Sequence, residues 1–340
     1  MGPSERAAHL HPAGVRRVDE DTIELSWNAM GALNGVRVFH GNAPAALADH
    51  PPVARVDGGD RIVLPAPVAA GPHFFRLESE NGGIALVGER RPFIEGAPNF
   101  RDLGGYETES GRRVRWGELF RSSHLGRLTE RGREQLLRLG IRTVCDFRTA
   151  AEAEKMPARF PQPGEARRVH LPIQHGDFEP TAVYERILRG DWDWISEEFM
   201  LEGYIESLER EPGLWRRFFE LAAAPENRPL LFHCTGGKDR TGTAAALLLL
   251  ALGVPGETVV ADYGLSDGYN APVRRAMFDQ LRPLGVDLER VTPYFTAPES
   301  RIRALLAYIR QTYGTALAYL TGRAGVPEET IARLRGELLE

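Results

Sequence analysis

The sequence predicts an α/β domain, built on a mostly parallel sheet flanked by helices, that follows a small all-β sandwich domain. The chain has 340 residues, which is enough for two domains with separate hydrophobic cores. In residues 1–92 the apolar residues fall in short alternating runs, the pattern of antiparallel strands. In residues 93–340 strand-like runs alternate with longer helical patterns, which indicates strands joined by helices. We therefore place the domain boundary between these two ranges.

The first domain contains five short runs that are typical of strands, separated by Gly, Pro, Asn and Asp. They cover residues 22–27, 36–39, 61–64, 73–77 and 84–87. Such alternation and punctuation predict an antiparallel sandwich. Because this part contains no catalytic grouping of residues, we expect it to dock a protein partner or to orient a substrate.

The second domain is predicted to contain a helix over residues 128–139, with Gly140 at its C-cap, and then a strand over 141–145. Residues 194–224 have a helical pattern that stops before Pro225. The remaining predicted elements are the strand 229–232 and the helices 244–252, 271–284, 299–313 and 331–339.

A glycine-rich loop joins the predicted strand 229–232 to the predicted helix 244–252. Cys234 opens this loop and Arg240 closes it, with five residues between them. Where a strand end meets a helix start, free backbone N–H groups and the positive end of the helix dipole converge. We therefore expect the loop to bind an oxyanion. The loop amides would come from Thr235, Gly236, Gly237, Lys238 and Asp239.

Cys234 and Arg240 make this anion site a candidate reaction site. A cysteine is nucleophilic as its thiolate, and loop amides, a helix N-terminus and a guanidinium all favour that anion. The planar fork of Arg240 can hold two phosphoryl oxygens, which lysine does less well. Prearranged donors then meet the charge that develops while sulfur attacks phosphorus. The spacing predicts a phosphocysteine intermediate at Cys234.

Three other interpretations of the loop fit the sequence less well. A nucleotide-binding P-loop needs Ser or Thr after its Lys, whereas Asp239 follows Lys238 here. Arsenate reductases need further thiols for their relay, and Cys145 is the one other cysteine in the chain. A buried structural cysteine would explain neither the glycines nor Arg240.

The loop from His233 to Gly242 resembles the signature loop of cysteine-dependent protein tyrosine phosphatases, in the bacterial branch that reads HCxxGKDRTG. Further blocks resemble the same branch, namely 99–106 (NFRDLGGY), 121–125 with 128–129, 146–148, 261–263 with Ser266, and 313–338. The resemblance covers residues 93–340 and is highly specific in the loop. Less specifically, Trp27 and the run 74–77 resemble a fibronectin type III module.

We hypothesise supporting roles for the residues around Cys234. His233 either fixes the loop by hydrogen bonding or is an ordinary structural histidine. Thr241 either donates its hydroxyl to the sulfur or merely caps the helix start. A lysine at the position of Lys238 also occurs in phosphoinositide phosphatases, so the resemblance implies that it binds a second phosphate; the alternative is a solvated lysine that raises the local potential. Supporting positions in the matching blocks are Arg101, Asp102, Asp146 and Arg148.

The leaving oxygen needs a proton from a general acid. Many tyrosine phosphatases use the Asp of a separate W-P-D loop, and this triplet does not occur here. In the branch that this chain resembles, the acid is the Asp inside the signature loop, which is Asp239. One alternative is that Asp239 pairs with Arg101 or Arg148 to hold the loop. Another candidate for the acid is Asp177.

Residues 178–194 interleave aromatic and apolar residues with charges. In the related branch, the segment that precedes the signature loop forms a helical lid over the site, so the resemblance implies a lid here. The alternative is a surface helix that packs its apolar stripe on the core.

Cys145 ends the predicted strand 141–145. We favour a packed core thiol for this residue. The alternative is a protective disulfide with Cys234, which would require a short Cα separation.

The composition argues against several other classes of protein. The net charge of −5 argues against a general nucleic-acid binder. Two cysteines do not make a disulfide framework and fit a reducing compartment, and the Cys and His residues are too sparse for a zinc site. Residues 1–17 lack the apolar core of a signal peptide, and the apolar run 243–254 is too short to span a bilayer. We expect a cytoplasmic protein, with export without a signal peptide as the alternative.

Together, these observations predict a phosphomonoesterase that uses neither a metal nor a cofactor. The favoured substrates are phosphotyrosine proteins, with dual or triple specificity that extends to phosphoserine/threonine or phosphoinositides. A phosphoinositide or inositol phosphate phosphatase is the second enzyme hypothesis. A non-catalytic phosphate-binding adaptor is the hypothesis from a different class.

Overall fold

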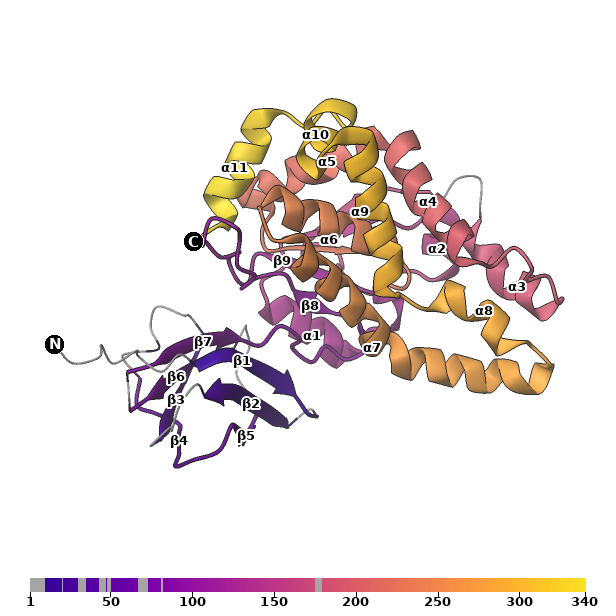
Figure 1. The fold of residues 1–340 in the computed structure, drawn as a ribbon. Helices are drawn as coiled ribbons and strands as arrows, with labels where there is room; N and C mark the ends of the chain where they lie inside the picture. Colours follow the sequence, from indigo (N-terminus) through magenta and orange to yellow (C-terminus); the bar gives the residue numbers. More distant parts are fainter. Residues whose placement is uncertain are drawn as a thin grey trace. The chain divides into compact units, whose positions relative to one another are not determined.

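The computed structural model of the chain describes residues 10–19, 21–29, 35–42, 47, 50–66, 73–80, 82–174 and 179–340. The chain divides into two compact units, Met1–Phe93 and Ile94–Glu340 (Figure 1). Each unit has hydrophobic clusters of its own.

The described part of the first unit contains two antiparallel sheets. One has the order β1-β2-β5 and consists of β1 Leu10–Arg17, β2 Thr22–Ala29 and β5 Arg61–Pro65. The other has the order β4-β3-β6-β7 and consists of β4 Ala54–Val56, β3 Val36–Gly41, β6 Phe74–Ser79 and β7 Ile84–Gly88.

The two sheets share one hydrophobic core. Side chains alternate between the faces of a strand, so Ile23, Leu25 and Trp27 of β2 point to the same side and are buried with Val38 and Leu77 of the other sheet. The five predicted strands are present. The sequence analysis missed β1, whose Pro12 and Gly14 interrupt the apolar alternation, and β4, which has only 3 residues.

The second unit is built on a sheet with the order β11-β10-β12-β9-β8. Its strands are β8 Arg101–Asp102, β9 Leu119–Ser122, β10 Thr143–Asp146, β11 Arg167–His170 and β12 Leu230–His233. The pairs β10–β11, β10–β12 and β12–β9 are parallel, and β8 pairs antiparallel with β9. The prediction of a mostly parallel sheet is therefore confirmed, with β12 at its centre.

Helices cover both faces of this sheet (Figure 1). Leu230 and Phe232 of β12 join a core with α5, α6, α9 and α11, whereas Leu231 joins a second core with Leu136 of α1. The longer described helices are α1 Glu130–Arg138, α4 Glu197–Arg210, α5 Pro212–Ala223, α6 Arg240–Ala251, α7 Gly256–Leu281, α8 Leu288–Phe295, α9 Glu299–Tyr313 and α11 Glu328–Leu338. The shorter ones are η2 Leu125–Arg127, α2 Ala150–Lys155, η3 Pro180–Ala182, α3 Val183–Leu188, η4 Pro225–Asn227, η5 Arg282–Leu284, α10 Ala316–Ala318 and η6 Tyr319–Arg323.

The predicted α1 and α9 are confirmed. Thr129 caps the start of α1 by accepting a hydrogen bond from the Gly132 amide, and Gly140 follows its end with φ +66, a conformation that glycine adopts without strain. The predicted range 299–313 coincides with α9.

Two helix predictions are wrong in their bounds. Residues 194–224 form two helices, because α4 ends at Arg210 and Pro212 starts α5, a position where proline is favoured. The predicted helix 271–284 is the second half of α7, which begins at Gly256 and carries Pro272 in its interior. None of the described helices is long and apolar enough to span a membrane.

Candidate active site

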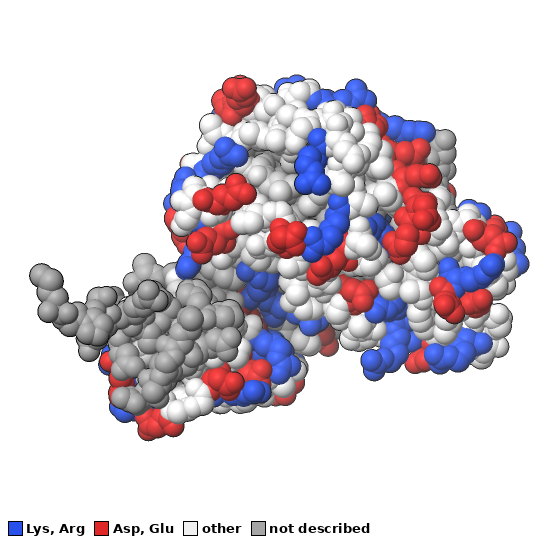
Figure 2. Space-filling model, in the orientation of Figure 1, with Lys and Arg blue, Asp and Glu red and all other residues white. Residues whose placement is uncertain are grey.

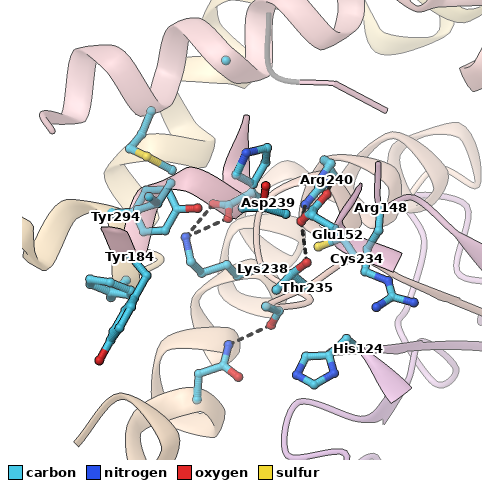
Figure 3. Close-up of a pocket in the computed structure, with 18 of the residues that line it drawn as sticks. His124, Arg148, Glu152, Tyr184, Cys234, Thr235, Lys238, Asp239, Arg240 and Tyr294 are labelled. Carbon is cyan, nitrogen blue, oxygen red and sulfur yellow. Dashed lines mark hydrogen bonds and ion pairs between the residues drawn. The ribbon is translucent and has the colours of Figure 1, made fainter. Parts of the chain in front are cut away.

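The loop between β12 and α6 forms the floor of a cavity of about 590 Å³ (Figure 3). Cys234 follows directly after β12 and is 1% exposed, and Arg240 is the first residue of α6. Both line the cavity. The predicted strand, loop and helix are therefore confirmed, and the free N–H groups of the α6 start lie at the loop.

Side chains from three other segments hold the carbonyl oxygens of the loop. Asn99 Nδ2 donates to Gly236 O at 3.1 Å and to Gly237 O at 3.0 Å. Asn270 Nδ2 of α7 donates to Gly236 O at 3.0 Å, and Arg121 Nη2 of β9 donates to Gly237 O at 2.9 Å. Since these donors fix the carbonyls, they also fix the peptide planes, and the loop amides are oriented before a ligand binds.

Gly237 is required where it stands. Its φ is +65, and a Cβ built on it would lie 2.3 Å from Ser122 O of β9. Only glycine combines this conformation with so close a backbone approach.

Two buried arginines share one carboxylate beneath the loop. Asp262 of α7 accepts from Arg101 Nε at 3.1 Å and from Arg121 Nη1 at 2.6 Å, and all three side chains are 1% exposed or less. Burial, followed by the charge of Arg101, lowers the pKa of Arg121 to about 10. One carboxylate thus balances two guanidinium groups, which leaves positive charge under the anion-binding loop.

Glu152 of α2 holds the cavity arginine in a bidentate ion pair. Arg240 Nη1 and Nη2 each donate to Glu152 at 2.6 Å, and Thr235 Oγ1 donates to the same carboxylate at 2.5 Å. Burial alone would raise the pKa of Glu152, but the hydrogen bonds and charge of Arg240 outweigh it, so this pKa is lowered to about 2. In the described part of the chain, Arg240 Nε is buried without a hydrogen-bond partner, so a donor stays available for a bound anion.

Glu152 was not predicted from the sequence. The available signal was Thr149 three residues earlier, because the two residues form a capping box at the start of α2. That spacing indicates a helix start and not a site, so it did not point to Arg240.

Asp146, Arg148 and His233 meet at the ends of β10 and β12. Asp146 accepts from Arg148 Nε at 2.9 Å and from Arg148 Nη2 and Arg168 Nη2 at 2.8 Å each. His233 Nδ1 lies 3.0 Å from Cys234 O and 3.8 Å from Asp146 Oδ1. Burial lowers the pKa of His233, and its ring contacts the Cys234 backbone beside the Asp146–Arg148 pair.

Three side chains surround Asp239, two that donate hydrogen bonds to it and one cation that lies nearby. Lys238 Nζ donates to both of its oxygens at 2.8 Å, Tyr204 OH donates to Oδ1 at 2.5 Å, and Arg301 Nη1 lies 3.6 Å from Oδ1 (Figure 3 shows the lysine pair). Tyr204 OH also lies 2.7 Å from the hydroxyl of Tyr263. Burial, and then the charge of Asp239, raises the pKa of Tyr204, which keeps this phenol protonated.

The alternative that Asp239 pairs with Arg101 or Arg148 is wrong. Arg101 is bound to Asp262 and Arg148 to Asp146. The sequence analysis also missed Tyr204 and Arg301, because they lie in helices whose patterns show only packing.

The remaining predicted residues are less central. Asp102 accepts from the amides of Gly104 and Gly117 at 2.7 Å each, so it shapes turns and does not line the cavity. Thr241 Oγ1 is buried without a hydrogen-bond partner among the described residues. Asp177 lies outside the described residues.

Cys145 packs in the core. It lies on β10 opposite Phe232 of β12, is fully buried, and forms no disulfide. Burial raises the pKa of its thiol to about 12. These facts match the packed core thiol that the sequence analysis favoured.

The predicted lid segment borders the cavity. Phe178 lies outside the described residues, and the rest contains η3 and α3. Val183 and Tyr184 line the cavity, while Ile187 packs in a cluster with Leu281 and Val291. The neighbouring part of the cavity wall was not predicted from the sequence and comes from Val273 and Met277 of α7 and from Tyr294 and Phe295 of α8; Figure 3 shows Tyr294 on the same side as Tyr184.

The chain matches the model of the tyrosine phosphatase family over residues 92–340. It is 35% identical over 243 residues to a protein of Cupriavidus necator that is named provisionally as a tyrosine-protein phosphatase, which covers 71% of this chain and 85% of the relative. It is 34% identical over 279 residues to the triple specificity protein phosphatase PtpB of Mycobacterium tuberculosis, covering 72% and 98%. It is 30% identical over 231 residues to a tyrosine-protein phosphatase of Nostoc commune, covering 64% and 73%.

Proposed function

This chain belongs to the tyrosine phosphatase family and is a protein tyrosine phosphatase, and from that premise we propose which residues carry the reaction. Cys234 is the nucleophile, Arg240 binds the phosphoryl group and Asp239 moves the proton. One observation carries this assignment: Cys234 and Arg240 line one cavity, and Glu152 fixes Arg240 there through two hydrogen bonds of 2.6 Å.

The first step transfers the phosphoryl group to sulfur. The Cys234 thiolate attacks phosphorus while the bond to the leaving oxygen breaks, and the protonated Asp239 carboxyl gives its proton to that oxygen. The loop amides and the free Nε of Arg240 take the equatorial oxygens, whose charge develops in the transition state. Because Asn99, Asn270 and Arg121 hold the loop from outside, these donors need little reorganisation.

The second step returns the enzyme to its starting state. Water attacks phosphorus, the sulfur–phosphorus bond breaks, and Asp239 accepts a proton from the water. Phosphate leaves and Cys234 is again a thiolate. The unpaired hydroxyl of Thr241 supplies a donor for the departing sulfur.

The walls of the cavity support an aryl substrate. Tyr184, Val273 and Phe295 line it above the loop, and apolar walls with a few polar groups at the base suit an aromatic ring that carries one phosphate. The relative in Mycobacterium tuberculosis is named a triple specificity phosphatase, and we propose the same breadth here, with phosphotyrosine proteins first and phosphoinositides among the further substrates.

We propose that residues 1–92 form a fibronectin type III-like module. Its role would be to dock a protein partner. The two antiparallel sheets of its described part support this assignment.

An acid-quench experiment tests the proposed chemistry. Protein stopped during turnover of a phosphotyrosine peptide is digested and analysed by mass spectrometry, and we expect phosphate on the peptide that contains Cys234. Phosphopeptide that binds tightly without release or labelling would instead favour the adaptor hypothesis. Release rates from phosphotyrosine, phosphoserine/threonine and phosphoinositide substrates then rank the enzyme hypotheses.

A further inference from the structure

The cavity offers polar groups that the catalytic phosphate does not use. We propose that His124, Arg127 and Lys155 form a second anion subsite that takes a second phosphate carried by the same substrate molecule. The proposal rests on the proposed function and narrows its substrate class. All three residues line the cavity that has Cys234 on its floor.

These residues come from two segments in contact with each other. Arg127 ends η2 and Lys155 ends α2. A Cβ built on Gly126 would lie 2.7 Å from Met156 Cγ and 2.9 Å from Pro157 O, so η2 packs directly against the end of α2. The His124 amide donates to Thr235 O at 2.9 Å, which ties the same segment to the signature loop.

Most cations that line the cavity already have a carboxylate partner. The pairs are Arg148–Asp146 at 2.8 Å, Arg240–Glu152 at 2.6 Å, Lys238–Asp239 at 2.8 Å and Arg274–Asp267 at 2.8 Å. Within the described part of the chain, Arg127 and Lys155 have no carboxylate partner, and Lys155 Nζ donates only to the neutral carbonyl of Thr181 at 3.1 Å. Lys238, which the resemblance offered for a second phosphate, is held by Asp239.

His124 adds a neutral donor between these cations and the loop. Its Nδ1 accepts from the Gly126 amide at 3.2 Å, so the ring proton is on Nε2. Burial, followed by the charges of Arg127 and Arg148, lowers the pKa of His124 to about 4, and the ring is neutral at pH 7. Figure 3 shows it on the side of Arg148 and away from Tyr184 and Tyr294.

The chemistry of the subsite fits a phosphate better than a carboxylate. A phosphate monoester carries a charge of about −1.5 to −2 and several acceptor oxygens, which matches two unpaired cations and an N–H donor. A side-chain carboxylate brings only one charge. Glu202 and Glu206 of α4 also line the cavity and would repel a second anion, so they direct it toward η2.

The positive charge of Arg127 and Lys155 is confined to the subsite. On the face seen in Figure 2, basic and acidic side chains of the second unit are interspersed and do not form one basic field. The chain as a whole carries a net charge of −5, so long-range attraction does not favour an anionic substrate, and the subsite selects through contacts inside the cavity.

The test compares one phosphate with two on the same scaffold. Soluble dioctanoyl phosphatidylinositol with a single ring phosphate and with two adjacent ring phosphates are turned over by the wild type, by Arg127→Gln, by Lys155→Gln and by the double variant. We expect the ratio of the two KM values to favour the bisphosphate by roughly tenfold in the wild type and to fall to about one in the double variant, since about 1.4 kcal/mol corresponds to tenfold. Arg333→Gln is the matched control, because Arg333 is an exposed arginine of α11 that does not line the cavity; it should keep the wild-type ratio.

Two further arms identify the source of the phosphate. Free inositol phosphates with the same one or two ring phosphates should show the same ratio if the headgroup alone is recognised, and a ratio present only with the lipids would overturn recognition by the cavity. A phosphotyrosine peptide with a neighbouring Glu that loses as much as the bisphosphate in the double variant would reassign the subsite to acidic peptides.

If no substrate is turned over, ligand binding to the Cys234→Ser protein still tests the subsite. Calorimetric titration should give tighter binding of the inositol bisphosphate than of the monophosphate, and the additional double substitution should remove the difference. Equal Kd values would contradict the subsite. Lack of phosphate release from every substrate, with this difference in Kd intact, would contradict the proposed function and leave the subsite standing.

Discussion

The two units differ in how their ion pairs are arranged. In the first unit, Arg16, Arg37 and Arg55 pair with carboxylates while 54% to 66% of their side chains stay exposed, and the pair of Arg17 with Glu89 is largely buried but stands apart from any catalytic grouping. In the second unit, the Asp262, Asp146 and Glu152 carboxylates pair with arginines beneath and around one loop, and the carboxylates are 5% exposed or less. Burying a charge costs free energy that its pairing only partly returns. A cluster of buried pairs therefore indicates that this part of the fold is arranged for a reaction.

The largest expected effect comes from removing the carboxylate that two arginines share. Asp262→Asn leaves Arg101 and Arg121 buried without their counter-charge and should lower the free energy of unfolding by about 3–5 kcal/mol. Glu24→Gln removes the partner of the exposed Arg16 and should cost less than about 1 kcal/mol. Calorimetric unfolding of the whole chain measures the loss of stability in both variants. Similar losses would contradict the stated difference between the ion pairs of the two units.

Next in size is the loss of the carboxylate that holds Arg240. Glu152→Gln keeps the shape of the side chain but weakens both hydrogen bonds to the guanidinium, and misplacing a substrate-holding group costs about 10²-fold in rate. We expect a drop of that size in kcat/KM for aryl phosphates. Glu154→Gln, an exposed neighbour on the same helix, is the control, and an equal drop in both variants would refute the positioning role.

A smaller effect should follow from Tyr204→Phe. Without the phenol, Asp239 is less well held and its ionised form is less favoured. We expect about a tenfold lower kcat for alkyl phosphates, a smaller loss for aryl phosphates with good leaving groups, and a falling limb of the pH profile that shifts to higher pH. Tyr319→Phe loses a buried hydroxyl bonded to Leu208 O at 2.9 Å and should change neither property. Uniform losses on both substrate classes with an unshifted limb would mean that Tyr204 only supports packing.

The smallest predicted effect concerns stability in acid. The pKa of Glu152 is lowered from 4.5 to about 2, so its ion pair contributes fully above pH 4.5 and this contribution is lost as the pH falls toward 2. Between pH 4.5 and about 2, the Glu152→Gln protein should therefore lose less stability than the wild type as the pH falls. Unfolding midpoints measured at several pH values test this, and parallel curves for the two proteins would contradict it.

The sequence predicted the centre of the site because its chemistry lies in one short loop. Cys234, the glycines and Arg240 are adjacent in the chain, and so are the strand and helix that flank them. The residues that hold the loop from outside could not be predicted in this way, because they lie in four separate helices. Glu152, Tyr204 and Arg301 contact residues of the loop, and Asp262 binds Arg121, which donates to Gly237 O.

The fold was predicted to a similar extent. Long patterned helices such as α9 were predicted with their bounds. The strands β9 and β11 were not predicted, because Arg121 in β9 and the pair Arg167 and Arg168 in β11 interrupt the apolar run that marks β10 and β12. The first half of α7 was not predicted as part of the same helix. Pro272 lies in the interior of α7, whereas a proline usually marks a helix start.

Catalysis by Cys234 is tested most directly by phosphate release from a phosphotyrosine peptide in EDTA and reductant, by the wild type and by Cys234→Ser. We expect steady release by the wild type without metal and none above background by the variant, which keeps the cavity but lacks the thiolate. Release that survives in Cys234→Ser would contradict nucleophilic catalysis at this residue.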